Sequence, residues 1–270
     1  MTRWAAELGF ARAFATRAGQ QIRQMVADGY RVEVKADRSP VTTADRCVNA
    51  RFISEVQDRF PGDGVLGEEG SHITNSERTW VIDPVDGTQQ LILGIPVFMV
   101  SIALVLDGQP VVAVAYNPST SESYWAQSGG GAHRDGSRLT VSAHDGIHTP
   151  ATVSAAGAAT SPGGLNADGL LRVTFAAGFD SHPRRFPWPS VFSGCKVAEG
   201  VWEADLYSGA AAHDVAAVCL LVQEAGGTVT DRTGAIQRYD RPVNGCLLSN
   251  TVIHNVLVEE WQRTYRPRSG

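Results

Sequence analysis

The chain has 270 residues, of which 43% are hydrophobic and 19% are charged, and its formal net charge is −5. This composition is typical of a folded globular protein with about two domains or one large one, and it excludes disordered, fibrous and disulfide-scaffold classes. A mildly acidic chain without a long basic cluster is not expected to bind nucleic acid.

The four cysteines are far apart and form no CxxC pair, which predicts reduced thiols and argues against a zinc ribbon or a CxxC redox motif. The N-terminus lacks the basic, apolar and cleavage regions of a signal peptide. The longest nearly uncharged apolar run, residues 91–106, contains Gly94 and Pro96 and is too short to span a bilayer. We therefore expect a cytoplasmic protein with no membrane partner.

In the first half of the chain, apolar residues recur at spacings of three and four from 4 to 25, which predicts an amphipathic helix that ends near Gly29. A second helix is predicted from 44 to 60, with Thr42 or Thr43 as its N-cap and Pro61-Gly62 as its stop. Apolar runs bounded by turn residues then predict strands at 80–83, 98–106, 111–116 and 123–126.

Residues 149–169 are rich in small residues without a core pattern, which indicates a domain boundary or a mobile loop. After this stretch, strands are predicted at 171–175, in a segment ending at Tyr207 and at 228–231, and helices at 193–200 and 214–225. Because helices alternate with strands in both halves, we expect an α/β (α+β) layered fold with an N-terminal domain over 1–145 and a C-terminal domain over 146–270.

The segment Gly62-Asp-Gly-Val-Leu-Gly67 matches the GxGxxG pattern of dinucleotide-binding proteins. That fingerprint requires a strand before the first glycine and a helix after the last, whereas here a predicted helix and Pro61 come first. Glu68 and Glu69 follow, where they would repel the phosphates of a dinucleotide. We therefore disfavour a dinucleotide-dependent oxidoreductase and interpret the segment as a glycine turn between a helix and a strand.

Acidic residues are expected to converge just beyond this turn. Glu68 follows the turn, and Asp83 and Asp86 flank Pro84-Val85, whose proline is predicted to break the strand so that both aspartates and the Val85 carbonyl face one point. Two carboxylates about 4 Å apart repel by about 4 kcal/mol at an effective dielectric of about 20, so the cluster implies a cation or raised pKa values. Ligands that are all oxygen favour Mg²⁺, Mn²⁺ or Ca²⁺ over zinc. On the local sequence alone, an acidic strand end with an Asx-turn is the alternative.

Three blocks resemble the signature segments of the inositol monophosphatase family. They are Gly67-Glu68-Glu69, then Trp80-Val-Ile-Asp83-Pro-Val-Asp86-Gly-Thr88, and then His213-Asp214-Val-Ala-Ala217 with Glu224-Ala-Gly-Gly227. The upstream segment from Lys35 to Pro40-Val-Thr-Thr-Ala-Asp45 is also similar to that of the family. Order and spacing agree over about residues 30–250, which is specific for the family and says little about the substrate.

The resemblance implies a layered α-β-α-β-α sandwich and Mg²⁺-dependent, lithium-sensitive hydrolysis of a small phosphate monoester such as an inositol, polyol or sugar phosphate. It implies two or three Mg²⁺ ions per site, with Mn²⁺ as the alternative, and relatives are commonly homodimers. Phosphate monoesters hydrolyse so slowly unaided that water activated by bound metal is the expected device.

By the same resemblance, the metal ligands correspond to Glu68, Asp83, the Val85 carbonyl, Asp86 and Asp214. The catalytic group that orients the attacking water corresponds to Asp45, Glu68 and Thr88. Substrate contacts correspond to Asp86, Gly87, Thr88, Arg185, Ser190, Tyr207 and Asp214. Two of these acids have local alternatives, because Asp214 also fits a helix N-cap and Asp45 alone also fits a solvated helix acid.

The sequence departs from the family pattern around the substrate. His213 stands where the family usually has tryptophan, and Tyr207 stands where inositol-type members carry a glutamate that holds substrate hydroxyls. The loop Arg185-Phe-Pro-Trp-Pro-Ser190 is bulkier than the usual run of small residues. Residues 196–207 resemble the branch acting on 3′-phosphoadenosine 5′-phosphate, whereas residues 61–69 resemble bacterial histidinol-phosphate phosphatases. These two phosphatases are the alternatives, and a non-catalytic binding module is a further hypothesis.

Overall fold

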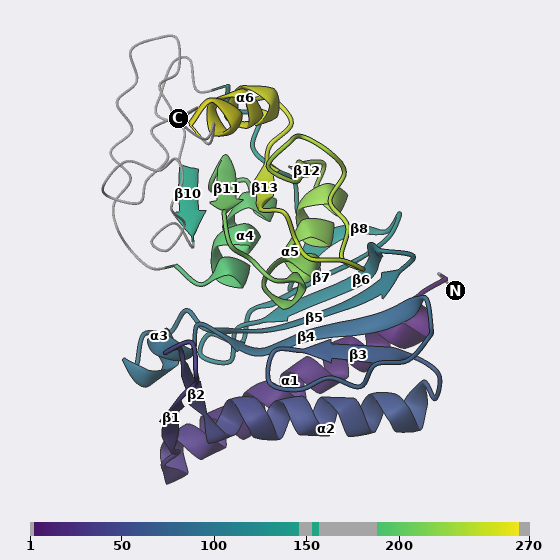
Figure 1. Cartoon of the computed structure of the whole chain (residues 1–270), viewed down its shortest axis with the longest axis vertical. Coiled ribbons are helices and arrows are strands. Elements are labelled where there is room, and N and C mark those ends of the chain that lie inside the picture. The colour runs from purple at the N-terminus through teal and green to yellow at the C-terminus, as the bar shows by residue number, and fades with distance from the viewer. Residues whose placement is uncertain (1–2, 146–152, 157–187, 265–270) are drawn as a thin grey trace.

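The computed structural model describes residues 3–145, 153–156 and 188–264 (Figure 1). Within this part of the chain the helices are α1 (Ala5–Asp28), α2 (Thr43–Arg59), α3 (Thr88–Ile92), α4 (Ser190–Ala198), α5 (Ala212–Glu224) and α6 (His254–Thr264). The three longest helix predictions correspond to α1, α2 and α5, and Thr42 is the N-cap of α2. The strand predicted at 171–175, most of residues 149–169 and the proposed domain boundary after residue 145 lie outside the described residues.

The larger sheet has the strand order β3-β4-β5-β6-β7-β8-β9. β3 runs parallel to β4, and each further pair of neighbours is antiparallel. The strands are β3 (Gly64–Gly67), β4 (Arg78–Asp86), β5 (Met99–Leu106), β6 (Gln109–Tyr116), β7 (Ser123–Gln127), β8 (Gly131–Arg134) and β9 (Ser137–Arg138). The four strands predicted between residues 80 and 126 are thus β4 to β7.

A smaller sheet has the order β10-β11-β13-β12. Its strands are β10 (Val153–Ala156), β11 (Ala204–Tyr207), β12 (Thr228–Thr230) and β13 (Cys246–Ser249). β10 lies inside the stretch that the sequence marks as lacking a core pattern, and it pairs in parallel with β11. Near the N-terminus, β1 (Val32–Val34) and β2 (Pro40–Thr42) form a separate antiparallel pair.

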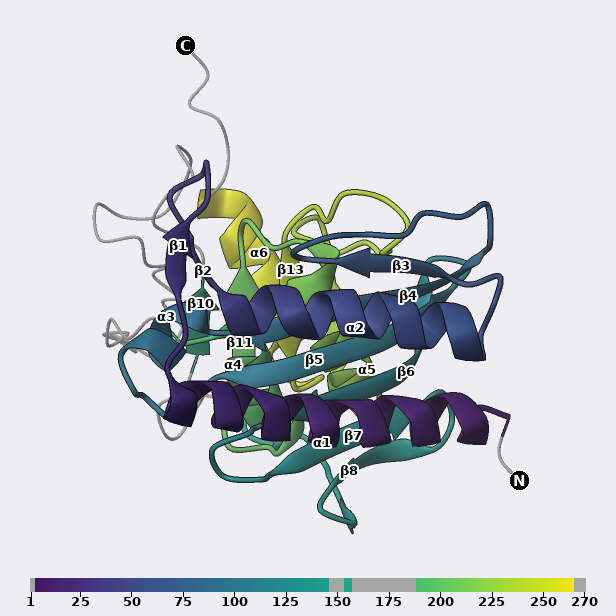
Figure 2. The same ribbon diagram turned by 90° about the horizontal axis from the view of Figure 1, so that it is seen from below.

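The elements stack as five layers, α-β-α-β-α, as predicted (Figure 1). α1 and α2 lie side by side over one face of the larger sheet, as the view from below shows (Figure 2). α4 and α5 lie between the two sheets, and α6 covers the outer side of the smaller sheet. Alternation along β4 separates two cores, because Trp80 and Ile82 join the cluster under α1 and α2 whereas Val81 joins the cluster around α5.

The path of β4 corrects one prediction. Pro84 does not end the strand, which continues to Asp86, but the pairing with β5 shifts between Asp83 and Asp86. A proline has no N–H to give to the ladder, so a sheet tolerates it where the register is already irregular. The irregularity leaves Asp83, Val85 and Asp86 together at one end of the larger sheet.

The glycine-rich segment before Glu68 also differs from its prediction. Only residues 61–63 form the turn, and Gly64–Gly67 is strand β3, paired in parallel with β4. In this register Gly67 lies opposite Ile82, and the Glu68 N–H donates to the Ile82 carbonyl at 3.2 Å. The pairing therefore places Glu68 beside Asp83.

Two further sequence predictions concern the thiols and the membrane. The four cysteines are free thiols, as expected, and Cys219 Sγ lies 3.4 Å from Cys246 Sγ in the core around α5. Over the ranges that the structure describes, no helix combines the length and the hydropathy needed to cross a bilayer.

Candidate active site

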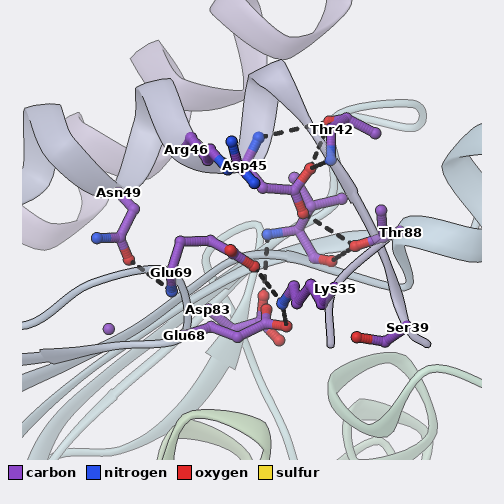
Figure 3. A network of polar contacts seen from close by, with 12 residues as sticks. Lys35, Ser39, Thr42, Asp45, Arg46, Asn49, Glu68, Glu69, Asp83 and Thr88 are labelled. Carbon is purple, nitrogen blue, oxygen red and sulfur yellow. Dashed lines mark hydrogen bonds and ion pairs between the residues drawn. The ribbon is translucent and has the colours of Figure 1, made fainter. Parts of the chain in front are cut away.

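The first turn of α2 fixes one side of the site through a capping box. Asp45 is fully buried, and its Oδ2 accepts hydrogen bonds from the Thr42 N–H at 2.9 Å and from the Thr42 hydroxyl. Its Oδ1 lies 2.9 Å from Thr88 Oγ1, which also lies 3.1 Å from the Val85 carbonyl oxygen (Figure 3). Burial raises the pKa of Asp45, although the hydrogen bonds from Thr42 and Thr88 oppose that shift. The predicted Asp45–Thr88 pair is thus in direct contact.

One turn further along α2, Asn49 holds the segment that carries Glu68 and Glu69. Its side chain donates to the Gly70 carbonyl at 2.9 Å. It also accepts from the Glu69 N–H at 3.4 Å (Figure 3). A Cβ at Gly67 would collide with Asn49 Oδ1, so only glycine allows this close approach. Asn49 is not among the site residues predicted from the sequence, although Thr42, Asp45 and Asn49 have the spacing of one helix face.

Lys35 lies between the two glutamates. Its Nζ lies 2.7 Å from Glu68 Oε1 and forms a second, shorter ion pair with Glu69 Oε1. Partial burial alone would lower the pKa of Lys35, but the hydrogen bonds and charges of Glu68 and Glu69 outweigh it and raise the pKa. Lys35 therefore stays a cation beside the acids.

Asp86 reaches across to the C-terminal half of the chain. Its Oδ1 accepts from the Ser190 hydroxyl at 2.8 Å and from the Ser190 N–H at 3.2 Å, and its Oδ2 accepts from the Val191 N–H at 2.8 Å. These donors belong to the first turn of α4, whose N-cap position, Pro189, offers no side-chain cap. Asp86 therefore caps α4 from the other half of the molecule.

Asp214 approaches from α5. Asp214 is not the N-cap that the local sequence suggests: Ala211 is the N-cap of α5, and Asp214 Oδ2, from the first turn, accepts from the Ala211 N–H at 2.6 Å. His213 Nε2 lies 3.6 Å from Asp214 Oδ1. The charge of Asp214 also acts on Asp83 and Asp86, which places all three carboxylates in one cluster.

The electrostatics of this cluster are those of crowded acids. Burial, followed by the charges of Glu68, Asp86 and Asp214, raises the pKa of Asp83. Burial also raises the pKa of Asp86 to about 7 against the hydrogen bond from Ser190, and burial raises that of Asp214 against the charge of His213. A nearby cation would stabilise the ionised form of these carboxyl groups, and such raised pKa values are common at functional sites.

The donor set fits a hard divalent cation. It consists of the carboxylates of Glu68, Asp83, Asp86 and Asp214 with the Val85 carbonyl, and all of these are oxygen ligands of the kind that Mg²⁺ takes. In residues 3–145, 153–156 and 188–264, no group of three or more His, Cys, Asp or Glu side chains lies close enough together to coordinate a metal ion in the present side-chain positions. The carboxylates instead use Lys35, α4 and the Ala211 N–H as partners.

Of the predicted substrate contacts, Asp86, Ser190 and Asp214 are described above, and the other four lie as follows. Gly87 and Thr88 lie at the start of α3, where Gly87 has a φ of +95° and packs against Pro189. Arg185 lies outside the described residues. Tyr207 differs from its expected placement, because it is only 2% exposed and its hydroxyl bonds to protein groups rather than facing the site.

A cleft of about 750 Å³ adjoins the acids on the side of β3. Its wall includes Gly67 and His213, the chain neighbours of Glu68 and Asp214, and it extends to Tyr239 and Val243. This volume is in the range of small-molecule sites between structural units.

Comparisons with known proteins agree with this geometry. The profile described as "Inositol monophosphatase family" matches residues 5–265. The chain is 37% identical over 236 residues to a protein named histidinol-phosphatase from Mycobacterium tuberculosis, covering 84% of this chain and 88% of that one. It is 36% identical over 208 residues to an inositol-1-monophosphatase from Rhizobium meliloti, covering 75% and 76% of the two chains. Among solved structures, the suhB protein of Bartonella henselae superposes with a TM-score of 0.83 at 29% identity, covering 96% of this chain and 99% of that one.

Proposed function

Because the chain belongs to the inositol monophosphatase family, it is a phosphoric monoester hydrolase acting on a small phosphorylated metabolite, and we propose that its cofactor is Mg²⁺. The observation that carries this proposal is the gathering of Glu68, Asp83, Asp86 and Asp214 from both halves of the chain, with raised pKa values on the three aspartates. When bound, Mg²⁺ supplies charge neutralisation and lowers the pKa of water.

The residues that would hold the metal are the four carboxylates and the Val85 carbonyl. We propose two or three ions, with Mn²⁺ as a substitute, because the ligands are hard oxygens. The cluster draws Asp86 from β4 and Asp214 from α5, so residues 1–145 and 146–270 would act as one catalytic unit. The cytoplasmic location and the homodimer expected from the sequence stay predictions.

Thr88 and Asp45 are proposed to orient the attacking water. The Thr88 hydroxyl donates its single proton to Asp45 or to the Val85 carbonyl, which leaves lone pairs on Oγ1 to accept a hydrogen bond from water. Glu68 lies beside Asp83 and is a second acceptor for that water. In this proposal the two groups would hold the attacking water toward phosphorus, and no covalent nucleophile is needed.

The proposed substrate is a small phosphorylated polyol, sugar or inositol, with Gly87, Thr88 and Asp214 as the contacts nearest the acids. Histidinol phosphate is the second candidate, for two reasons. Tyr207 gives no free carboxylate to accept substrate hydroxyls, and one of the relatives is named histidinol-phosphatase. 3′-Phosphoadenosine 5′-phosphate is the third compound to compare.

A phosphate-release assay tests this function. The panel contains inositol phosphates, sugar phosphates, histidinol phosphate and 3′-phosphoadenosine 5′-phosphate, each with Mg²⁺, Mn²⁺, Mg²⁺ plus Li⁺, or EDTA. We expect Mg²⁺-dependent release from at least one compound and inhibition by Li⁺ and EDTA. Release from none of them would support a binding module instead, and release that EDTA leaves unchanged would reject the metal mechanism.

A further inference from the structure

We propose that Ser190 and Tyr207 are positioning residues that hold the carboxylate of Asp86, and that neither side chain contacts the substrate. This inference rests on the proposed function, in which Asp86 is a metal ligand. It assigns Tyr207, which stands in place of the glutamate of inositol-type relatives, to the support of the metal cluster.

The first link joins Asp86 to α4. Both carboxylate oxygens accept hydrogen bonds from Ser190 and Val191, at distances of 2.8 to 3.2 Å. The first N–H groups of a helix have no partner inside it, and the positive end of its dipole favours an anion. The orientation of Asp86 is therefore set by where the first turn of α4 lies.

The second link joins α4 to Tyr207. The Tyr207 hydroxyl lies 2.8 Å from the Ser190 carbonyl oxygen and shares its single proton between that carbonyl and Asp205. The Ser193 hydroxyl lies 3.1 Å from the same carbonyl and 3.1 Å from the Pro189 carbonyl. Ser190 is thus held by its carbonyl while its N–H and hydroxyl hold Asp86. A displacement of Ser190 would move two of the three donors to that carboxylate.

The third link fixes Tyr207 itself. Its strand, β11, lies between β10 and β13, and Tyr207 pairs with Cys246 of β13. The Tyr207 hydroxyl also contacts the carboxyl group of Asp205, which is fully buried and accepts from the Leu206 N–H at 3.0 Å. Burial, followed by the charge of Asp205, raises the pKa of Tyr207 and keeps its hydroxyl a donor. The smaller sheet therefore supports Asp86 through Tyr207 and Ser190.

A residue that positions a metal ligand and a residue that contacts the substrate are expected to change different constants when they are substituted. Removing a partner that orients a metal ligand usually weakens metal affinity or activity by about 10- to 100-fold. Removing a substrate contact raises KM instead. Tyr207→Phe keeps the buried ring and deletes only the hydroxyl, so it separates the two roles.

The test measures Mg²⁺ binding by calorimetry and steady-state kinetics at a series of Mg²⁺ concentrations, on the full chain. For Tyr207→Phe we expect Mg²⁺ affinity about 10-fold weaker and kcat reduced at low Mg²⁺, with the substrate KM at saturating Mg²⁺ within about 2-fold of the wild type. Ser190→Ala, which keeps the N–H donors, should shift Mg²⁺ affinity in the same direction by a smaller factor.

The matched control is Tyr124→Phe. The Tyr124 hydroxyl also bonds to a buried carboxyl group, that of Glu199 at the other end of α4. We expect this control to leave Mg²⁺ affinity unchanged. A Tyr207→Phe variant with a raised substrate KM and wild-type Mg²⁺ affinity would assign Tyr207 to the substrate and overturn the proposal, as would a variant with no change at all.

Two further measurements separate failure of this proposal from misfolding of the variant and from failure of the proposed function. If Tyr207→Phe does not fold, Ser190→Ala alone decides, because wild-type Mg²⁺ affinity in that variant would reject the link to Asp86. Calorimetry with Mg²⁺ needs no substrate, so it tests the positioning role even if the phosphate-release panel finds no activity in the wild-type protein.

Discussion

The two halves of the active site are built in different ways. In the N-terminal half, Asp83 and Asp86 belong to β4, Thr88 begins α3 and Glu68 directly follows β3, so the pairing of β3 with β4 brings the acids together. Asp45 and Asn49 of α2 add hydrogen bonds to Thr88 and to the segment after Glu68. In the C-terminal half, Ser190, Tyr207 and Asp214 come from three separate elements and meet the acids through hydrogen bonds and packing. Residues 68–88 thus contain most of the proposed metal ligands and the strand pairing that positions them. The residues of the C-terminal half reach the acids only when the whole chain is folded.

Asp86→Asn gives the largest expected effect, because Asp86 is a proposed metal ligand in the N-terminal half and also caps α4 of the C-terminal half. An amide lacks the negative charge of the carboxylate, and its NH₂ group would face an N–H donor of α4. We expect phosphate release to fall by at least ~10³-fold, about 4 kcal/mol of barrier. A circular dichroism spectrum and melting curve close to those of the wild type show that the fold survives, and substantial Mg²⁺-dependent turnover would contradict the metal role.

Thr88→Val tests the N-terminal half alone. Valine has nearly the same shape as threonine but cannot donate to Asp45 or to the Val85 carbonyl. We expect kcat to fall by about 10²- to 10³-fold with little change in KM, because groups that orient and deprotonate water contribute effects of this size. An equal fall in kcat at saturating Mg²⁺ for Thr88→Val and Tyr207→Phe would contradict the different roles that we propose for the two halves of the site.

Asn49→Ala asks whether the motif needs support from outside its own segment. The change removes both hydrogen bonds to the Glu69–Gly70 backbone, so Glu68 should lose its fixed position. We expect activity to fall by about 10-fold. The exposed Asn75→Ala is the matched control, and an Asn49→Ala enzyme as active as that control would show that strand pairing suffices.

The smallest expected effect is a pH dependence of stability. Folding raises the pKa of Asp86 to about 7 through burial, so this group makes its full contribution to stability below about pH 4 and loses it as the pH rises through about 7. Mg²⁺ binds the ionised form and should therefore raise the melting temperature more at about pH 8 than at about pH 5, by about 5 °C at saturation. Melting curves with EDTA or Mg²⁺ at both pH values measure this, and an equal Mg²⁺ effect at both would contradict it.

Sequence patterns predicted the elements whose signals are local. The periodicity of α1 and α2, the capping threonine and the acids at the end of β4 follow from residues close in the chain. Tyr207 was beyond such reasoning, because its burial depends on strands β10 and β13, which are distant in sequence. Likewise, no local rule states that the carboxylate of Asp86 caps α4.

The length of strand β4 past Pro84 is a second feature that the sequence could not predict. The proline signals an interruption, but only the pairing with β5 decides whether the strand ends or continues in a shifted register. Asn49 is the opposite case, because its spacing from Thr42 and Asp45 was visible. The sequence could not predict its bonding partner, which is the backbone of Glu69 and Gly70.

The division of the larger sheet between two cores has a consequence for cooperativity. Successive residues of β5 alternate between them, with Met99, Ala103 and Val105 in the core around α5 and Ile102 and Leu104 in the core under α1 and α2. One strand is thus a common wall for both halves, and separating them at residue 145 would expose an apolar sheet face to water. We therefore expect the two halves to fold as one unit, and a chain cut between them to aggregate rather than yield two stable pieces.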